Sequence, residues 1–341
     1  MINSSTVAGD VVDVAIIGAG PTGLFAAFYA GLRQMSVKIL DSLEILGGQL
    51  NTLYPEKYIY DVAGFAKVLA KDLAAGLVEQ AMQYHPVVCL GEQVQKLDFD
   101  EATRVYTLTT PKAVHKARSI IISAGVGAFQ PKKLPLSNAT QFEGKGLHYF
   151  VKELSVFRGR RVLIVGGGDS AVDWANMLAP IAGKVTVIHR RDQFRAHEDS
   201  VLKMKQTSCH IKTFYELKAI SGSGPLQQAI IYDNRTKQEE ILEMDDVLVN
   251  IGFVSALGPI KEWGLEIEGA SIKVNSMMLT NRPGIFSAGD ICTYPGKLKL
   301  IATGFGEACT AANYAKHYLD PAAHIFPGHS SNMKDVPQSV K

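Results

Sequence analysis

A glycine-rich turn between an apolar strand and a helix occurs twice in this chain and constrains its fold more than any other feature. The first copy, GAGPTG, follows the apolar residues 14–17, and the second, GGGDSA, follows residues 162–165. In such a unit the first glycine permits a tight turn, the second lets a pyrophosphate approach the backbone, and the third small residue lets the helix pack on the strand. The helix N-terminus offers unpaired N–H groups to the phosphates. The sequence therefore predicts two dinucleotide-binding units.

The residue that ends the second strand differs between the two units. Asp41 and His189 occupy the same place, each 23 residues after the first glycine of its turn. A carboxylate accepts hydrogen bonds from a ribose 2′-hydroxyl and would repel a 2′-phosphate, whereas an arginine offers phosphate a charged, bidentate fork. Because Arg190 and Arg191 follow His189, the second site is predicted to prefer NADPH to NADH; an ordinary solvated charge run is the alternative. The predicted NADPH contacts are Gly166, Gly168, Asp169, Ser170, Ala171, His189, Arg190, Arg191 and Arg195.

The first unit can hold either NAD or FAD. Two nicotinamide sites would have nothing to exchange, whereas a flavin beside a nicotinamide completes a hydride relay, so FAD is the simpler prediction. Late in the chain, the apolar residues 285–288 lead to Asp290 and then to a predicted helix at residues 303–318. Asp290 could be a simple turn residue. Beside an FAD-type turn, we expect it to bind the ribityl chain, and we expect the helix N-terminus to stabilise negative charge on the flavin.

Length and composition limit the remaining function classes. A chain of 341 residues suggests two domains, and 47% hydrophobic with 20% charged residues is typical of a folded globular protein. The net charge of +2 gives no reason to expect a nucleic-acid partner. The N-terminus lacks the pattern of a secretion signal, and no apolar run approaches the ~20 residues of a membrane span.

The number and spacing of the cysteines argue against dithiol chemistry and predict a cytoplasmic location. Four cysteines are scattered along the chain, too far apart for a CxxC pair or a zinc motif. Isolated reduced cysteines are typical of a cytosolic protein. We therefore expect no internal disulfide relay and no metal site. These residues are Cys89, Cys209, Cys292 and Cys309.

Seven short motifs are spread over nearly the whole chain. They are GAGPTG, GGQL at residues 47–50, IISAG at 121–125, GGGDSA, HRRDQFR at 189–195, NIGF at 250–253 and SAGD at 287–290. Together they resemble the two-domain flavoproteins of the thioredoxin reductase group. Thioredoxin reductase itself has a cysteine pair before the second turn, at places that hold Tyr149 and Lys152 here. The ferredoxin–NADP reductases of this group lack that pair and extend beyond the last helix, and the chain resembles them in both respects.

This resemblance implies an enzyme that passes electrons between NADPH and ferredoxin or flavodoxin through FAD. Tyr54 would stack on one face of the isoalloxazine. The C-terminal tail, with His329, would cover the other face in the partner subunit of a homodimer, either shuttling a proton or packing on the ring; a disordered polar tail is the alternative. No residue is a certain general acid or base, because hydride transfer depends on positioning. The implied FAD contacts are Gly18, Gly20, Thr22, Gly23, Asp41, Gln49, Tyr54, Val94, Phe129, Asp290 and Ser331.

The predicted architecture is α/β, with two Rossmann-like, three-layer domains. The FAD-binding domain is predicted to comprise residues 1–124 and 254–341, the latter ending in the tail over the flavin. The NADPH-binding domain, residues 125–253, is inserted between them. The two connections, near residues 125–127 and 252–255, contain glycines and suit a hinge. The resemblance implies that rotation about this hinge brings the nicotinamide to the flavin.

An acidic ferredoxin would require a basic docking face. The candidates, each of which could also be an ordinary solvated surface group, are Lys132, Lys133, Arg158, Arg160, Arg161, Lys297 and Lys299. Two other functions stay open. One is an NADPH-dependent flavin disulfide reductase that acts without an internal CxxC, and the other is a non-enzymatic flavoprotein that senses NADPH.

Overall fold

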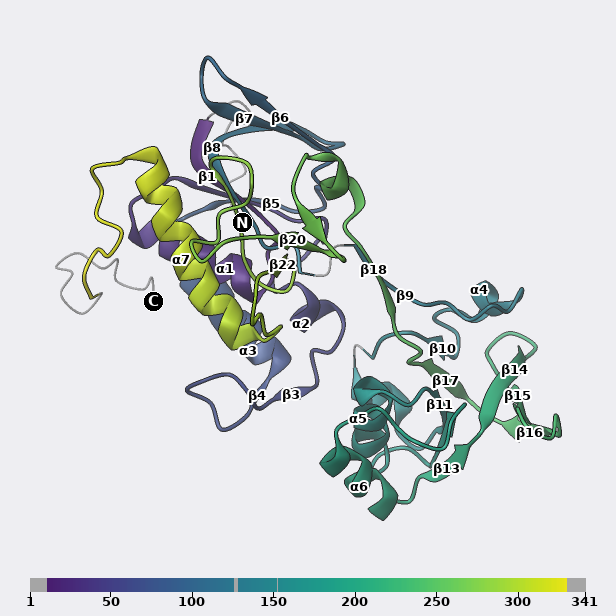
Figure 1. Cartoon of the computed structure of the whole chain (residues 1–341). Coiled ribbons are helices and arrows are strands. Elements are labelled where there is room, and N and C mark those ends of the chain that lie inside the picture. The colour runs from purple at the N-terminus through teal and green to yellow at the C-terminus, as the bar shows by residue number, and fades with distance from the viewer. Residues whose placement is uncertain (1–10, 126–127, 152, 330–341) are drawn as a thin grey trace. The chain divides into compact units, whose positions relative to one another are not determined.

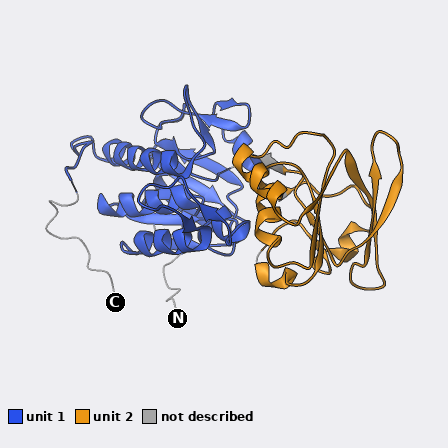
Figure 2. Cartoon of the chain, turned by 90° about the horizontal axis from the view of Figure 1, so that it is seen from below, with its two compact units in different colours: residues 1–128, 255–341 blue, residues 129–254 orange. Residues whose placement is uncertain are grey.

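The computed structural model describes residues 11–125, 128–151 and 153–329, which divide into two units (Figure 2). Unit 1 comprises Met1–Ala128 with Ser255–Lys341, and unit 2 comprises Phe129–Val254. Each unit contains a sheet whose central strands are parallel, with strand–turn–helix connections. The predicted fold class, two Rossmann-like units with one inserted into the other, is confirmed.

Unit 1 is built on a seven-stranded sheet in which six strands have the order β5-β2-β1-β8-β7-β6 and the seventh, β21, pairs with β8. The long strand β8 pairs with β7 through its first half and with β21 through its second half. Because the chain continues from β1 to β2 on one side and returns to β8 on the other, the carboxyl end of β1 lies at a switch point, where such sheets bind ligands. The parallel strands are β1 (Val11–Ile17), β2 (Val37–Leu40), β5 (Val87–Cys89), β8 (Val114–Ile122) and β21 (Ile285–Ser287), and the antiparallel ones are β6 (Lys96–Asp100) and β7 (Val105–Thr109).

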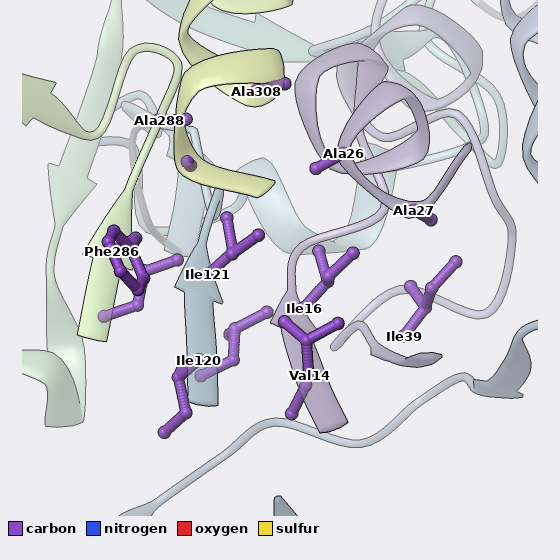
Figure 3. Close-up of a cluster of buried hydrophobic side chains, with 14 of the residues drawn as sticks. Val14, Ile16, Ala26, Ala27, Ile39, Ile120, Ile121, Phe286, Ala288 and Ala308 are labelled. Atoms are coloured by element: carbon purple, nitrogen blue, oxygen red, sulfur yellow. The ribbon is translucent and has the colours of Figure 1, made fainter. Parts of the chain in front are cut away.

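Three helices of unit 1 lie together: α1 (Pro21–Leu32), α3 (Ala70–Met82) and α7 (Ile301–Leu319) (Figure 1). Helices α1 and α7 pack through small side chains, which let two backbones approach closely. Figure 3 shows Ala26 of α1 and Ala308 of α7 above Ile16 and Ile121 of the sheet, and all four side chains are fully buried. The strands can be apolar without alternation because both of their faces are covered.

Unit 2 contains a five-stranded parallel sheet and a separate antiparallel sheet. The parallel sheet has the order β10-β17-β11-β12-β13. Its strands are β10 (Leu147–His148), β11 (Arg161–Val165), β12 (Lys184–His189), β13 (His210–Thr213) and β17 (Asp246–Val249), with helices α5 (Asp169–Leu178) and α6 (Glu198–Gln206). The antiparallel sheet consists of β14 (Tyr215–Ser221), β15 (Gln228–Asp233) and β16 (Glu239–Glu243).

The two connections between the units pair with each other as a ribbon of β9 (Ala128–Pro131) and β18 (Phe253–Ala256). In the described parts of the chain, no helix has both the length and the apolar character needed to cross a membrane. The remaining short elements are α2 (Gln49–Thr52), β3 (Tyr58–Ile59), β4 (Val68–Leu69), α4 (Ala139–Phe142), the 3-10 helices η1 (Leu154–Phe157) and η2 (Gly258–Glu262), β19 (Ile267–Glu268), β20 (Ser271–Lys273) and β22 (Cys292–Thr293).

Candidate dinucleotide-binding sites

The glycine turn after β1 is closed from behind by Ser123, the residue that follows β8. The N–H of Gly18 donates to the Leu40 carbonyl at 2.8 Å, and Ser123 Oγ donates to the Gly18 carbonyl at 3.0 Å. A Cβ on Gly18 would lie 2.5 Å from the Ser123 carbonyl oxygen, and a Cβ on Gly23 would lie 1.8 Å from that of Gly18. A Cβ on Gly20 would meet no atom within 4 Å. The first and third glycines are thus needed for packing, and the open space beside the second fits a pyrophosphate.

Asp41 follows β2, and its carboxylate is bonded to the same turn. Oδ2 accepts a hydrogen bond from the N–H of Ala19 at 2.6 Å, and Oδ1 accepts one from the N–H of Leu43 at 2.8 Å. Burial raises the pKa of Asp41, and these two donors oppose the shift. Since a carboxylate has about four acceptor positions, Asp41 retains capacity to accept hydrogen bonds from ribose hydroxyls.

Three segments that are distant in sequence meet at Thr22, in the first turn of α1. A Cβ on Gly289, in the loop after β21, would lie 2.9 Å from Thr22 Oγ1. A Cβ on Gly304, in the first turn of α7, would lie 2.3 Å from the same atom. The loop that carries Asp290 and the start of α7 therefore approach the glycine turn about as closely as their backbones allow.

The charge of Asp290 acts on Tyr54 in unit 1. Burial raises the pKa of Tyr54 to about 12, and the charges of Asp290 and Asp61 add to the shift. Burial also raises the pKa of Asp290, while the charges of Lys297 and Lys299 lower it. A partly buried phenol ring beside a partly buried carboxylate offers an apolar surface and a hydrogen-bond acceptor in one place, a combination that fits a flavin with its ribityl chain.

A buried ion pair beside this loop was missed by the sequence reasoning. Lys297 Nζ lies 2.6 Å from Glu307 Oε2, and both side chains are only 4% exposed. Glu307 also accepts hydrogen bonds from the N–H of Gly289 at 2.7 Å and from the Tyr294 hydroxyl at 2.6 Å. The prediction that Lys297 belongs to a surface docking face is therefore wrong. The Lys297 ammonium is paired with Glu307 inside unit 1, and this ion pair joins α7 to the loop that carries Asp290.

Of two further residues predicted to contact FAD, Gln49 is placed near the turn by the elements around it, and Val94 is buried. Gln49 begins α2, directly after Gly48, and a Cβ on Gly48 would lie 2.8 Å from the Cα of Gly20. A Cβ on Gly125 would lie 3.2 Å from Gln49 Nε2. Val94 is buried, in the segment that leads to β6.

The tail is only partly covered by the structure. Its beginning is held by Arg33, at the end of α1, whose guanidinium donates to the carbonyls of His324 at 2.7 Å and Ile325 at 3.1 Å. His329 is exposed and packs edge-on against Phe326, with ring centroids 5.4 Å apart. Two predicted FAD contacts, the side chain of Phe129 and the whole of Ser331, lie outside the described residues.

The turn after β11 repeats the geometry of the first turn. The N–H of Gly166 donates to the Ile188 carbonyl at 3.0 Å, and a Cβ on Gly166 would lie 2.3 Å from the Asn250 carbonyl oxygen. Gly168 precedes α5, and a Cβ on it would meet nothing within 4 Å. Ala171, in the third position, is fully buried. As in unit 1, the first and third residues of the turn are closely packed, and the second has open space beside it.

Asp169 and Ser170 begin α5, and the loop after β12 folds back onto them. Asp169 Oδ1 accepts a hydrogen bond from the N–H of His197 at 2.9 Å. The N–H of Arg195 donates to the Gly167 carbonyl at 2.7 Å. The loop that carries the arginines is therefore fixed against the glycine turn, because its backbone N–H groups donate to the Asp169 carboxylate and to the Gly167 carbonyl.

The arginines predicted to bind a 2′-phosphate converge at the end of β12. Arg190, Arg191 and Arg195 are all exposed, and within the described residues none of them has a carboxylate partner. Burial lowers the pKa of His189, and all three arginines lower it further, so their charges act on one place. Because cations without a partner can bind a phosphate at little cost, this arrangement fits the 2′-phosphate of NADPH.

Known proteins resemble this chain over nearly its whole length. Residues 12–312 match the model of the pyridine nucleotide-disulphide oxidoreductases. The chain belongs to this family. It is 56% identical over 325 residues to a ferredoxin–NADP reductase of Halalkalibacterium halodurans, which covers 95% of this chain and 98% of that protein. It is 55% identical over 323 residues to ferredoxin–NADP reductase 2 of Bacillus anthracis, covering 95% and 97%.

Two solved structures share the fold. The thioredoxin reductase of T. acidophilum matches with a TM-score of 0.79 at 26% identity, over 92% of this chain and all of that one. The bacillithiol disulfide reductase of Staphylococcus aureus matches with a TM-score of 0.73 at 18% identity, over 90% and 98%, which is a likeness of fold alone. The predicted resemblance to the thioredoxin reductase group is confirmed.

Although the pyridine nucleotide-disulphide oxidoreductase family is named for disulfides, all four cysteines of this member are free. Tyr149 stands at one of the two places that correspond to the cysteine pair. It is buried, and its hydroxyl accepts a hydrogen bond from the N–H of Leu134 at 3.3 Å. Lys152, at the other place, lies outside the described residues. The side chain at the described place thus has a packing role and no redox chemistry.

Proposed function

We propose that this chain is an FAD-dependent ferredoxin–NADP reductase, which transfers electrons between NADPH and ferredoxin or flavodoxin. The observation that carries this proposal is the 55–56% identity, over 95% of the chain, to proteins named ferredoxin–NADP reductase. The family match agrees with the two predicted cofactors, FAD and NADPH. The free cysteines favour an acceptor outside the chain over an internal disulfide.

The FAD site is proposed in unit 1, at the carboxyl ends of β1, β2 and β21. There the open space beside Gly20, the carboxylate of Asp41 and the pair of Tyr54 and Asp290 would hold pyrophosphate, ribose and flavin, respectively. The first turn of α7 lies against Thr22, so its unpaired N–H groups would face the same region. The other predicted FAD contacts, including Phe129 and Ser331, remain part of this proposal.

The NADPH site is proposed in unit 2, on the turn after β11. Gly166, Gly168 and Ala171 would let the pyrophosphate approach the N-terminus of α5. Arg190 and Arg191 would bind the 2′-phosphate, with Arg195 held beside them by its bond to Gly167.

The chain would act in this reaction mainly by positioning its cofactors. FAD, when bound, accepts a hydride from nicotinamide and supplies electrons singly to a one-electron acceptor. Tyr54 would orient the flavin by contact with its ring, and Asp290 would hold the ribityl chain. The buried Lys297–Glu307 pair keeps the Asp290 loop in place. We assign no general acid or base, and we propose that the ribbon of β9 and β18 is the hinge between the units.

The assembly and location are further parts of the proposal. A homodimer, in which the tail with His329 covers the flavin of the partner subunit, is supported by the family resemblance. A cytoplasmic location is supported by the four free cysteines. A basic docking face for an acidic acceptor retains Lys132, Arg158 and Lys299, which are exposed.

The experiment that tests this function is NADPH-driven reduction of cytochrome c by the purified flavoprotein, with and without an added ferredoxin. The expected result is a rate that depends on both NADPH and ferredoxin, with little activity when NADH replaces NADPH. Bleaching of the flavin by NADPH without any ferredoxin effect would contradict the acceptor and leave the nucleotide sites standing. The disulfide reductase alternative would then be tested with low-molecular-weight disulfides. Failure to turn over with either acceptor would favour the NADPH-sensing alternative.

A further inference from the structure

Cys89, Glu92 and His115 form a compact cluster in unit 1 that the electron-transfer proposal does not use. A ligand atom from each of the three side chains lies within 4.8 Å of the others. His115 Nε2 is 2.9 Å from Glu92 Oε2, and the His115 side chain is only 4% exposed. The sequence predicted no metal site, because 26 residues separate the first and last members and no motif connects them.

Nε2 is the ring nitrogen of His115 that faces Glu92, so it is the atom that would bind an ion together with that carboxylate. Glu92 Oε2 also accepts a hydrogen bond from Thr110 Oγ1 at 2.7 Å. Nδ1, on the other side of the ring, is buried and has no hydrogen-bond partner within the described part of the chain. A thiolate, an imidazole and a carboxylate are each common ligands of Zn²⁺, and a site with three protein ligands leaves one position open.

We propose that Cys89, Glu92 and His115 bind one divalent transition-metal ion of the zinc class. Cys89 would bind as the thiolate and release its proton to solvent. The thiolate and the Glu92 carboxylate would offset the two charges of the ion. The ammonium groups of Lys38 and Lys112 act on Cys89 and Glu92, respectively, so binding is expected to be weaker than in a four-cysteine site.

The bound ion would fasten the loop that frames Asp41. The carbonyl of Cys89 accepts a hydrogen bond from the N–H of Asp41 at 3.0 Å, and the N–H of Glu92 donates to the carbonyl of Asp41 at 2.8 Å. Two of the three ligands are therefore bonded directly to the backbone of Asp41. The ion would act by fastening this loop, and its site lies next to, but outside, the atoms proposed to contact FAD.

The test uses the tag-free holoprotein, stripped with a chelator and titrated with Zn²⁺ by calorimetry and with Co²⁺ by absorption. We expect one ion per chain, a thiolate-to-cobalt charge-transfer band and a higher thermal midpoint with Zn²⁺. Cys89→Ser, a nearly isosteric change, should abolish the band and weaken Zn²⁺ binding by more than the roughly 100-fold loss that follows removal of a supporting residue around a metal ligand. His115→Gln should weaken binding similarly.

Cys209→Ser is the matched control, because Cys209 is also half-buried and free but lies outside the cluster. It should leave the cobalt band and the Zn²⁺ affinity unchanged. Absence of a bound ion in the wild type, or equal binding by wild type and Cys89→Ser, would overturn the proposal. Neither readout depends on ferredoxin or NADPH, so its failure is distinguishable from failure of the proposed function.

Discussion

At the scale of single residues, Gly20 and Gly23 belong to one motif but differ in the space around them. A side chain would have room at Gly20 and would collide with backbone at Gly23. We expect Gly23→Ala to destabilise the protein by about 3 kcal/mol, because its Cβ would lie 1.8 Å from the Gly18 carbonyl oxygen. Gly20→Ala has room and a negative φ, so the thermal midpoint of its FAD-free form should stay near that of the FAD-free wild type. Its methyl group would occupy space proposed for the pyrophosphate, and the FAD content after purification should fall. Gly168→Ala, the equivalent change in unit 2, is the control and should leave FAD content unchanged.

The preference for NADPH is also decided by individual side chains. The double variant Arg190→Ala/Arg191→Ala loses two cations that have no partner in the described structure, and each charged hydrogen bond contributes ~1.5–3 kcal/mol. We expect the KM for NADPH in flavin reduction to rise at least about tenfold while the KM for NADH changes little. Arg158→Ala is a matched control, since Arg158 precedes β11 and so lies at the opposite end of that strand from the turn. A parallel loss with both nucleotides would contradict the assignment of these arginines to the 2′-phosphate.

At the scale of elements, the Lys297–Glu307 pair joins the loop after β21 to α7. Lys297→Met leaves the Glu307 carboxylate buried without its cation, which should lower the free energy of unfolding by ~3–5 kcal/mol. The control is Lys299→Met, on the same loop, because Lys299 is exposed, donates to Ser271 Oγ at 3.2 Å and has no carboxylate partner among the described residues. Denaturant unfolding monitored by circular dichroism would measure both. Lys297→Met/Glu307→Gln should recover part of the loss, and no recovery would indicate that the charge balance is not the cause.

At the scale of the whole molecule, the net charge of +2 does not say which cations are free to interact with a partner. Several of the lysines and arginines predicted for docking are already paired: Lys133 with Glu143, Arg160 with Asp246, Arg161 with Asp245 and Lys297 with Glu307. The first three remain partly exposed, but only part of their charge is available to a ferredoxin. Fewer free cations imply a smaller electrostatic contribution to docking than the sequence suggested.

Salt should nevertheless separate the two half-reactions. Raising the ionic strength from about 0.05 to 0.5 M shortens the screening length well below ~10 Å. We expect ferredoxin-dependent turnover to fall, because it depends on encounter between two charged surfaces, and NADPH reduction of the bound flavin to change less. Stopped-flow absorbance of the flavin and steady-state cytochrome c reduction would follow the two steps. Equal sensitivity of both would contradict a docking face of opposite charge.

The sequence by itself determined the two dinucleotide turns and the chemical contrast between Asp41 and His189. These features depend on short stretches, in which a strand, a glycine and a helix start follow one another, and so their geometry is local. Only the tertiary structure showed three contacts. Ser123 lies behind Gly18, Lys297 is buried against Glu307, and His115 lies in a cluster with Cys89 and Glu92. Such contacts join segments far apart in the chain, and whether a lysine is solvated or paired depends on burial, which no local pattern encodes.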